Sequence, residues 1–197
     1  MGLPVAKLVV ATNENDILAR TLRTGRYEMR GVTPTTSPSM DIQISSNFER
    51  LLFDANGRDP EAVRRAMSGL KQSGAFDIAE PALKAIRKEF RAGRASERQV
   101  KAMIRDVQSQ TGYVLDPHTA VGVHVAGRME KPSSPMITLA TAHPAKFPDA
   151  VKQACGIDPA LPSWLSDLMQ REERFSVVPN DQDGVESHIQ SLTRATR

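Results

Sequence analysis

A chain of 197 residues, 40% hydrophobic and 25% charged, has the composition of an ordinary globular protein and is long enough to bury a sizeable core. Lysine and arginine exceed aspartate and glutamate by only 26 to 23, and aromatic residues make up 5%, so we expect no nucleic-acid-binding surface. No apolar run is long enough to span a membrane, and the single cysteine excludes an intrachain disulfide and favours a reducing, cytoplasmic setting.

The first fifty residues are predicted to alternate between strand and helix. Residues 7–12 are mostly apolar and contain several β-branched side chains, which indicates a buried strand. The polar residues 13–16 then begin a short helix that Gly25 ends. Residues 46–49, Ser-Asn-Phe-Glu, match a capping box and predict the next helix.

The middle of the chain carries mainly helix signals. Pro60 begins one helix, and residues 96–99, Ser-Glu-Arg-Gln, form a second capping box ahead of an apolar stripe. Residues 76–90 are ambiguous, and we interpret them as a helix because Pro81 can start one. Together these elements predict a helical insertion at about residues 58–112.

The last third is predicted to contain a strand between two helices. Asp116 and Pro117 are typical of an N-cap and a first helical position, and the helix that they begin carries apolar residues round much of its surface. The apolar residues 136–141 predict a buried strand that leads into a helix at about residues 144–155. Strands separated by helices indicate an α/β fold.

A looser tail is expected after residue 160. The pattern predicts a helix at residues 162–169, a short strand at 175–178 and a closing helix at 183–195. The chain is therefore expected to divide into residues 1–160 and 161–197.

Four stretches, met in this order, resemble the threonine synthases. They are residues 9–16, 37–50, 112–122 and 141–147, the last reading Thr-Ala-His-Pro-Ala-Lys-Phe. The resemblance implies the three-layer fold of pyridoxal-phosphate enzymes of the tryptophan-synthase-β type, in which helices flank a mostly parallel sheet. It further implies that residues 1–160 are the carboxyl-terminal part of the large cofactor-binding domain. The implied activity is that of a pyridoxal-phosphate-dependent lyase that converts O-phosphohomoserine and water to threonine and phosphate.

The cofactor assignment depends on Thr141. In the resembled family the matching threonine faces the pyridine nitrogen of pyridoxal 5'-phosphate, and a neutral hydroxyl partner leaves that nitrogen unprotonated. By local sequence alone, Thr141 could instead cap the helix that begins near Pro144.

The candidate phosphate-binding site is a loop that enters a helix. Ser46, Asn47 and Arg50 offer hydroxyl, amide and guanidinium groups, which suit the phosphate of O-phosphohomoserine. The alternative is that Ser46 and Glu49 only cap the helix and that Arg50 is a surface residue.

Two further residues are expected near the substrate. Asn13 follows the first strand, where α/β sheets place ligand-facing side chains, although it could instead form an Asx turn or cap the helix. The resemblance places His118 near the pocket, and a structural histidine bonded to the backbone is the alternative. His118 and His124 are six residues apart and point to different sides of a helix, so we expect no metal site.

The resemblance also implies groups that this sequence lacks. The lysine that forms a Schiff base with the cofactor and a Gly-rich phosphate loop would lie upstream of residue 9. We therefore expect no catalytic residue in this chain, no activity from it alone, and a partner in the missing amino-terminal portion of the enzyme. A related pyridoxal-phosphate phospholyase and a non-catalytic remnant or interaction module are the alternatives.

Overall fold

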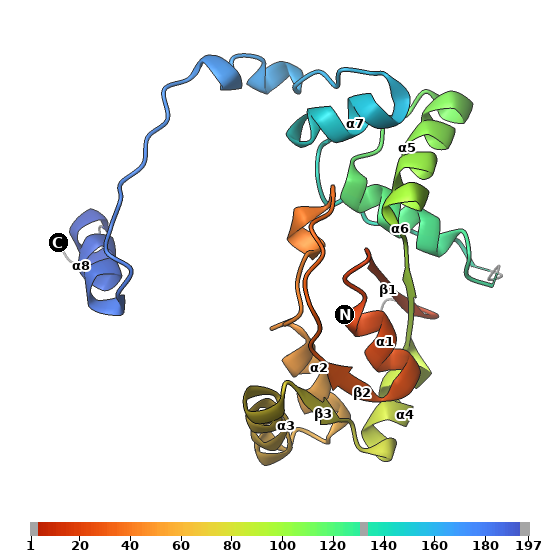
Figure 1. Ribbon diagram of the computed structural model, residues 1–197, viewed down its shortest axis with the longest axis vertical. Coiled ribbons are helices and arrows are strands. Elements are labelled where there is room, and N and C mark those ends of the chain that lie inside the picture. The colour runs from red at the N-terminus through yellow and green to blue at the C-terminus, as the bar shows by residue number, and fades with distance from the viewer. Residues whose placement is uncertain (1–3, 131–133, 194–197) are drawn as a thin grey trace. The chain divides into compact units, whose positions relative to one another are not determined.

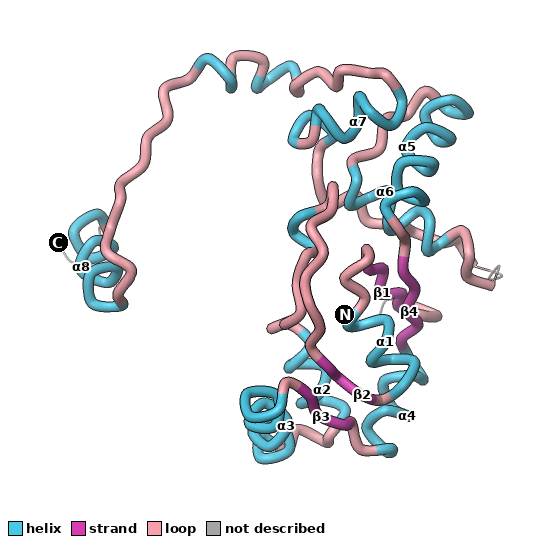
Figure 2. The backbone as a smooth tube through the Cα atoms, in the orientation of Figure 1, coloured by secondary structure: helices cyan, strands magenta, loops and turns pink. Residues whose placement is uncertain are grey.

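The computed structural model describes residues 4–130 and 134–193. Its internal contacts divide the chain into two units, Met1–Ala160 and Leu161–Arg197. Figure 1 labels the elements in chain order, and Figure 2 shows that helices and loops make up most of both units.

The first unit is built round two parallel strands. β1 (Leu8–Thr12) pairs with β4 (Phe90–Arg94), residue for residue along the whole length of both. The segment at residues 58–112, expected to be a helical insertion, contains helices but also β4, which belongs to this central pair. The sequence of β4 combines Gly93 with two arginines, and glycine and charged residues are uncommon in strands, so the pattern conceals it.

Helices cover both faces of the β1–β4 pair. On β4, Ala92 packs against the cluster that contains α1 (Ile17–Thr24), whereas a side chain placed at Gly93 would meet Val125 of α6 (Pro117–Ala126). Neighbouring residues of a strand point to opposite faces. The α1 cluster and α6 therefore lie on opposite sides, which gives the three layers of an α/β fold.

One core cluster joins α1 to a short antiparallel ribbon and three helices. Within it, Tyr27 stacks between Phe48 and Phe76, with ring centroids 5.6 Å and 4.9 Å away. Residues 76–90 are therefore not one helix, because they begin in a strand and end in β4. The elements of this cluster are β2 (Arg26–Glu28), α2 (Phe48–Ala55), α3 (Pro60–Ser73), β3 (Ala75–Asp77) and α4 (Glu80–Glu89).

A second core cluster forms where α5 (Glu97–Thr111) packs on α6 and α7 (Pro148–Cys155). The capping box at its start is confirmed: the Ser96 hydroxyl accepts from the Gln99 amide, and the Gln99 side chain accepts from the Ser96 amide. The N-cap at Asp116 is confirmed as well, since its carboxylate accepts from the amides of His118 and Thr119. Caps are local, so the sequence shows them directly.

The prediction of a buried strand at residues 136–141 is wrong for the described chain. The segment has no strand partner there, and the side chains of Ile137 and Leu139 are 79% and 77% exposed. A strand needs a hydrogen-bonded neighbour, and an apolar run cannot supply one by itself. The single helix expected at residues 144–155 is instead a 3-10 turn, η2 (Pro144–Lys146), followed by α7.

The second unit contains little regular structure. Its closing helix is confirmed as α8 (Gln182–Leu192), which begins at the N-cap Asp181. The expected helix at residues 162–169 is replaced by two 3-10 turns, η3 (Ser163–Leu165) and η4 (Leu168–Gln170), and no strand forms at residues 175–178.

Among the described residues, no helix is long and apolar enough to cross a bilayer. The same residues contain no cluster of three or more histidine, cysteine, aspartate and glutamate side chains that could hold a metal ion.

Candidate active site

Five polar side chains meet at the carboxyl end of β1 and form the polar hub: Asn13, Asn15, Thr35, Ser37 and Asp41. Asp41 is its centre, because Oδ1 accepts hydrogen bonds from Nδ2 of Asn13 at 2.7 Å and from Nδ2 of Asn15 at 2.9 Å. The Thr35 hydroxyl also donates to Oδ1 at 2.7 Å, and the Thr35 amide donates to Oδ2 at 2.8 Å. The hub thereby fastens the loop between β2 and α2 to the end of β1.

Asn13 is fully buried, and its side-chain amide hydrogen bonds to other residues of the hub. Its Nδ2 also donates to the hydroxyls of Thr35 and Ser37, at 2.8 Å and 3.0 Å. Its Oδ1 accepts from the Asn15 amide at 2.9 Å, which is the Asx turn weighed as an alternative from the sequence. In the described chain, Asn13 holds the loop in place.

The loop between β2 and α2 is anchored a second time just before α2. The Tyr27 hydroxyl accepts a hydrogen bond from the Ser45 amide at 2.9 Å. Burial among aromatic rings raises the pKa of the Tyr27 phenol above its ordinary value, and the Ser45 amide opposes this only in part. The loop is thus held at its middle by the hub and at its end by Tyr27.

The expected phosphate ligands lie directly after this anchor, and all are exposed. The capping box predicted at Ser46 and Glu49 is wrong: Asn47 is the N-cap of α2, its backbone is already helical, and no side chain caps the helix. The side chains of Ser46, Asn47 and Arg50 bond to nothing else in the part of the chain that the structure describes. They are therefore free to bind a ligand.

His118 is buried at the start of α6 with one nitrogen engaged. Its Nδ1 lies 3.2 Å from Oδ1 of Asp116, so its partner is a side chain and not the backbone. Its Nε2 is buried and has no partner among the described residues. The ring packs against Phe147, with centroids 4.7 Å apart, so the start of α6 touches the segment that follows Thr141.

Thr141 is exposed, and its hydroxyl has no partner within residues 4–130 and 134–193. It does not cap the turn that begins at Pro144. That position belongs to His143, whose Nδ1 accepts from the Ala145 amide at 3.2 Å. Thr141 is therefore not the cap of the helix near Pro144, and its neutral hydroxyl is available to hydrogen bond to a ring nitrogen.

Asn13 and the polar hub lie at the carboxyl end of β1, and His118 and the Thr141 segment lie near the same end. Ser46, Asn47 and Arg50 are not brought to this end, because the loop returns to β2 at the Tyr27 anchor before α2 begins (Figure 1). Gly93 faces Val125 of α6, whereas Ala95, further along, packs in the cluster that contains the earlier part of α6. The helix therefore runs antiparallel to β4, and its N-terminus lies near the carboxyl ends of both strands.

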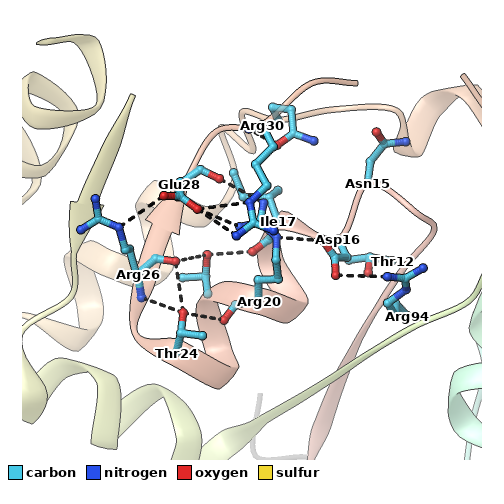
Figure 3. Close-up of polar contacts among 12 residues, drawn as sticks. Thr12, Asn15, Asp16, Ile17, Arg20, Thr24, Arg26, Glu28, Arg30 and Arg94 are labelled. Atoms are coloured by element: carbon cyan, nitrogen blue, oxygen red, sulfur yellow. Dashed lines mark hydrogen bonds and ion pairs between the residues drawn. The ribbon is translucent and has the colours of Figure 1, made fainter. Parts of the chain in front are cut away.

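A charged cluster beside this end was not anticipated from the sequence (Figure 3). The buried Arg20 donates to Asp16 at 2.9 Å and to the backbone oxygen of Glu28 at 3.0 Å, which ties α1 to β2. Arg30 hydrogen bonds to Glu28 and, with Arg26, lowers the pKa of the Glu28 carboxyl. Only the spacing of Asp16 and Arg20, one helical turn apart, could have signalled the cluster.

The sequence and fold match those of known threonine synthases. The family model for the threonine synthase C-terminal region matches residues 119–189. Threonine synthase of Pseudomonas aeruginosa is 47% identical over 191 residues, which cover 96% of this chain and 41% of the relative.

Solved structures show the same relationship. The crystal structure of a PLP-bound threonine synthase from Brucella melitensis has a TM-score of 0.89 and 61% identity, covering 99% of this chain and 42% of that one. The yeast threonine synthase has a TM-score of 0.81 and 38% identity, covering 96% of this chain and 42% of that one. The chain spans about two fifths of the length of these relatives. It belongs to the threonine synthase family and corresponds to the carboxyl-terminal portion of its members.

Proposed function

We propose that this chain forms the carboxyl-terminal portion of a pyridoxal-phosphate-dependent lyase that converts O-phosphohomoserine and water to threonine and phosphate. The observation that carries the proposal is the free hydroxyl of Thr141, in a chain 61% identical to a threonine synthase whose structure was solved with PLP bound.

Thr141 would hold the pyridine nitrogen of pyridoxal 5'-phosphate. When bound, the cofactor stores the electrons released from the carbon that carries the substrate amine. A hydroxyl cannot protonate the nitrogen as a carboxylic acid would, so Thr141 restrains this electron storage. The described chain supports this role because no other group competes for the hydroxyl.

Ser46, Asn47 and Arg50 would bind the substrate phosphate. The Arg50 guanidinium can form two parallel hydrogen bonds to phosphate oxygens, and the other two side chains add neutral donors. The Tyr27 and Asp41 anchors fix the loop on either side of Gln43, so the phosphate ligands start from an ordered backbone. Ordered donors lose less conformational entropy when they bind a ligand.

Asn13 and His118 would complete the substrate side of the pocket. Asn13 would act mainly through the polar hub, by fixing the loop over the end of β1. Because Nδ1 of His118 is hydrogen-bonded to the Asp116 carboxylate, which accepts, Nε2 is the nitrogen left to reach a bound molecule. Asn13 follows the carboxyl end of β1, and His118 lies at the start of α6 near the same end, where α/β proteins bind their ligands.

The missing amino-terminal portion would supply the lysine that binds the cofactor and the Gly-rich phosphate loop. On this proposal the chain alone is inactive. A cytoplasmic location is part of the proposal and is supported by the single cysteine, which is unpaired.

A related phospholyase is the second candidate. Such an enzyme would share the fold and the role of Thr141 but act on another substrate. The identities of 47% and 61% to threonine synthases of bacteria favour threonine formation. The remaining alternative, a non-catalytic remnant or interaction module, predicts no turnover even when the missing portion is restored.

The test uses a chimera in which residues 1–197 follow the amino-terminal portion of the Brucella melitensis enzyme, up to the start of the match. With pyridoxal phosphate and O-phosphohomoserine, the chimera should release phosphate and threonine in equal amounts. The 197-residue chain alone should release no phosphate above background and trap no cofactor with borohydride. Turnover by the chain alone would contradict the proposal.

The products separate the alternatives. Phosphate released with a product other than threonine would identify a related phospholyase. A folded chimera that binds the cofactor and releases no phosphate would identify a remnant.

A further inference from the structure

A cleft of about 490 Å³ is lined by residues of α1, α4 and β4. Its lining combines the apolar side chains of Leu22, Phe90 and Ala92 with four arginines. These arginines are Arg23, Arg87, Arg91 and Arg94. Clefts of this volume are large enough to hold a small organic molecule.

The arginines of this cleft are not neutralised by carboxylates. Asp16 is the one acidic residue in the lining, and its Oδ1 already accepts from Arg20 at 2.9 Å. Its Oδ2 lies 3.8 Å from Nη1 of Arg94 (Figure 3). In the part of the chain that the structure describes, no carboxylate pairs with the other three arginines. The cleft therefore carries an excess of positive charge, which favours a bound anion.

Two of the arginines are held in place by backbone carbonyls. Arg87 donates through Nε to the Leu22 carbonyl at 2.7 Å and through Nη2 to the Arg23 carbonyl at 2.6 Å. Arg91 donates through Nη1 to the carbonyls of Arg87 and Phe90. A guanidinium has five N–H donors, so Nη1 of Arg87 and both Nε and Nη2 of Arg91 are left for a ligand.

These bonds are also those of arginines that cap helix ends, because the carbonyls lie at the ends of α1 and α4. Capping does not account for Arg23, whose side chain has no partner among residues 4–130 and 134–193. It also does not account for four like charges round one cleft, since like charges repel. An anionic ligand accounts for both.

The cleft has two charged ends. Arg87 bonds to the end of α1, which places Arg23 and Arg87 at one end, and Arg91 bonds back toward Arg87. Asp16 precedes α1 and lies beside Arg94 at the end of β4. α1 therefore runs antiparallel to β4, and Arg91 and Arg94 are separated by about 10 Å along the strand. The apolar side chains belong to the same two elements and to the start of β4.

We propose that this cleft binds a small organic molecule that carries a phosphate and a second anionic group. Arg23, Arg87 and Arg91 bind the phosphate, because guanidinium groups offer paired donors that match phosphate oxygens. Arg94 pairs with the second anion, and the apolar body of the molecule lies against Leu22 and the start of β4. The site is separate from the residues proposed for the substrate phosphate, and the inference does not rest on the proposed function.

The test is a calorimetric titration of the 197-residue chain and of the chimera saturated with pyridoxal phosphate. The probe para-carboxyphenyl phosphate carries both anionic groups on a flat apolar body, and phenyl phosphate lacks the carboxylate. Both proteins should bind the first probe about 10-fold more tightly than the second, because the carboxylate adds a charge-assisted hydrogen bond.

Substitutions assign each end of the cleft. Arg23→Gln breaks no bond of the described chain and should weaken the binding of both probes about 10-fold. Arg94→Gln should weaken only para-carboxyphenyl phosphate, to the affinity of phenyl phosphate. Arg64→Gln, at an exposed arginine of α3, controls for net charge, and Arg50→Ala controls for the proposed substrate phosphate site. Neither control should change the affinity of either probe, and circular dichroism checks that every variant is folded.

Unchanged affinity for para-carboxyphenyl phosphate in either Arg23→Gln or Arg94→Gln would overturn the inference. Equal weakening by Arg64→Gln would show attraction to the net charge alone, and weakening by Arg50→Ala would assign the probe to the substrate phosphate site. Binding by the isolated chain that is lost in the chimera would show that the amino-terminal portion covers the cleft. Each of these outcomes also overturns the inference. Because the titrations need no turnover, a chimera that makes no threonine would contradict the proposed function and leave this inference standing.

Discussion

Asp41 shows how a single carboxylate can replace secondary structure in holding a loop. It accepts from two asparagines and from both the hydroxyl and the amide of Thr35, so one side chain satisfies four donors. Buried polar groups left without partners destabilise a fold, so these donors depend on one another through Asp41.

Asp41→Asn should destabilise the first unit by about 1–3 kcal/mol, because an amide NH₂ would then face one of the hydrogen-bond donors, leaving a buried donor unsatisfied. Denaturation by urea, followed by circular dichroism, measures the change. Asp54→Asn is the matched control, since Asp54 is exposed and its side chain pairs, among the described residues, only with Arg58 at the surface. It should change stability by less than about 0.5 kcal/mol. Equal effects of the two substitutions on stability would contradict the central role of Asp41 in the polar hub.

Arg50→Ala in the chimera should reduce kcat/KM for O-phosphohomoserine by a factor equivalent to about 2–5 kcal/mol if the charge pair with phosphate is desolvated. Steady-state kinetics measure it. Arg64→Ala serves as control because Arg64 is an exposed arginine of α3 paired with Glu61. An unchanged kcat/KM in Arg50→Ala would show that Arg50 does not bind the substrate phosphate.

For some candidate site residues, the sequence predicted the position in the fold but not the hydrogen-bond partners. Asn13 was expected at the end of a strand, and it is there, but only the folded loop shows that Asp41 and Thr35 use its amide. The partners lie 22 and 28 residues away, and no local pattern reports such contacts. Thr141 shows the reverse: local pattern suggested a cap, and the structure gives that cap to His143.

At the scale of elements, most helices and the first strand, β1, were predictable, whereas the other strands were not. The caps at Ser96 and Asp116 and the helix start at Pro60 are local signals, and all three are confirmed. β2 and β3 have three residues each, too short for an alternating pattern to emerge. The run at residues 136–141 had the pattern of a strand but not the neighbour that would make it one.

Tyr27 links three elements and makes their stability depend on pH. Burial raises its pKa, so the neutral phenol is favoured in the folded state. The stability that the neutral phenol contributes to the fold is fully present below the pKa of an unfolded tyrosine, about 10. It is lost as the pH rises through the higher pKa of the folded state. The free energy of unfolding should therefore fall more steeply above about pH 10 in the natural chain than in Tyr27→Phe.

Denaturant titrations across this pH range measure the difference. At neutral pH, Tyr27→Phe should cost about 0.5–1.5 kcal/mol through the lost bond to the Ser45 amide. Tyr113→Phe is the control, because Tyr113 is 58% exposed and should leave the profile unchanged. Parallel profiles for the natural chain and Tyr27→Phe would refute the assignment.

At the scale of the whole molecule, apolar surface is left uncovered in both units. Exposed large side chains include Ile137 and Leu139 in the first unit and Trp164, Phe175 and Val177 in the second. Exposed apolar patches of this kind mark surfaces that bind another chain or associate with one another.

The 197-residue chain should therefore bind a hydrophobic dye strongly or self-associate, whereas the chimera should do neither to the same extent. Light scattering after gel filtration, together with dye fluorescence at several protein concentrations, distinguishes the two behaviours. A monodisperse monomer without enhanced dye binding would contradict this expectation.

The pairing of β1 with β4 also has a consequence for the time course of folding. The Thr12 hydroxyl bonds to the backbone of Gly93, 81 residues further along, so joining these strands closes a long loop. Loop closure costs entropy before the new contacts stabilise it, and folds dominated by distant pairings form slowly. α2, α3 and α4 lie inside that loop and share one core, so they can assemble first. The parallel strand pair then forms in a late step, and with it the end of β1 on which the polar hub is built.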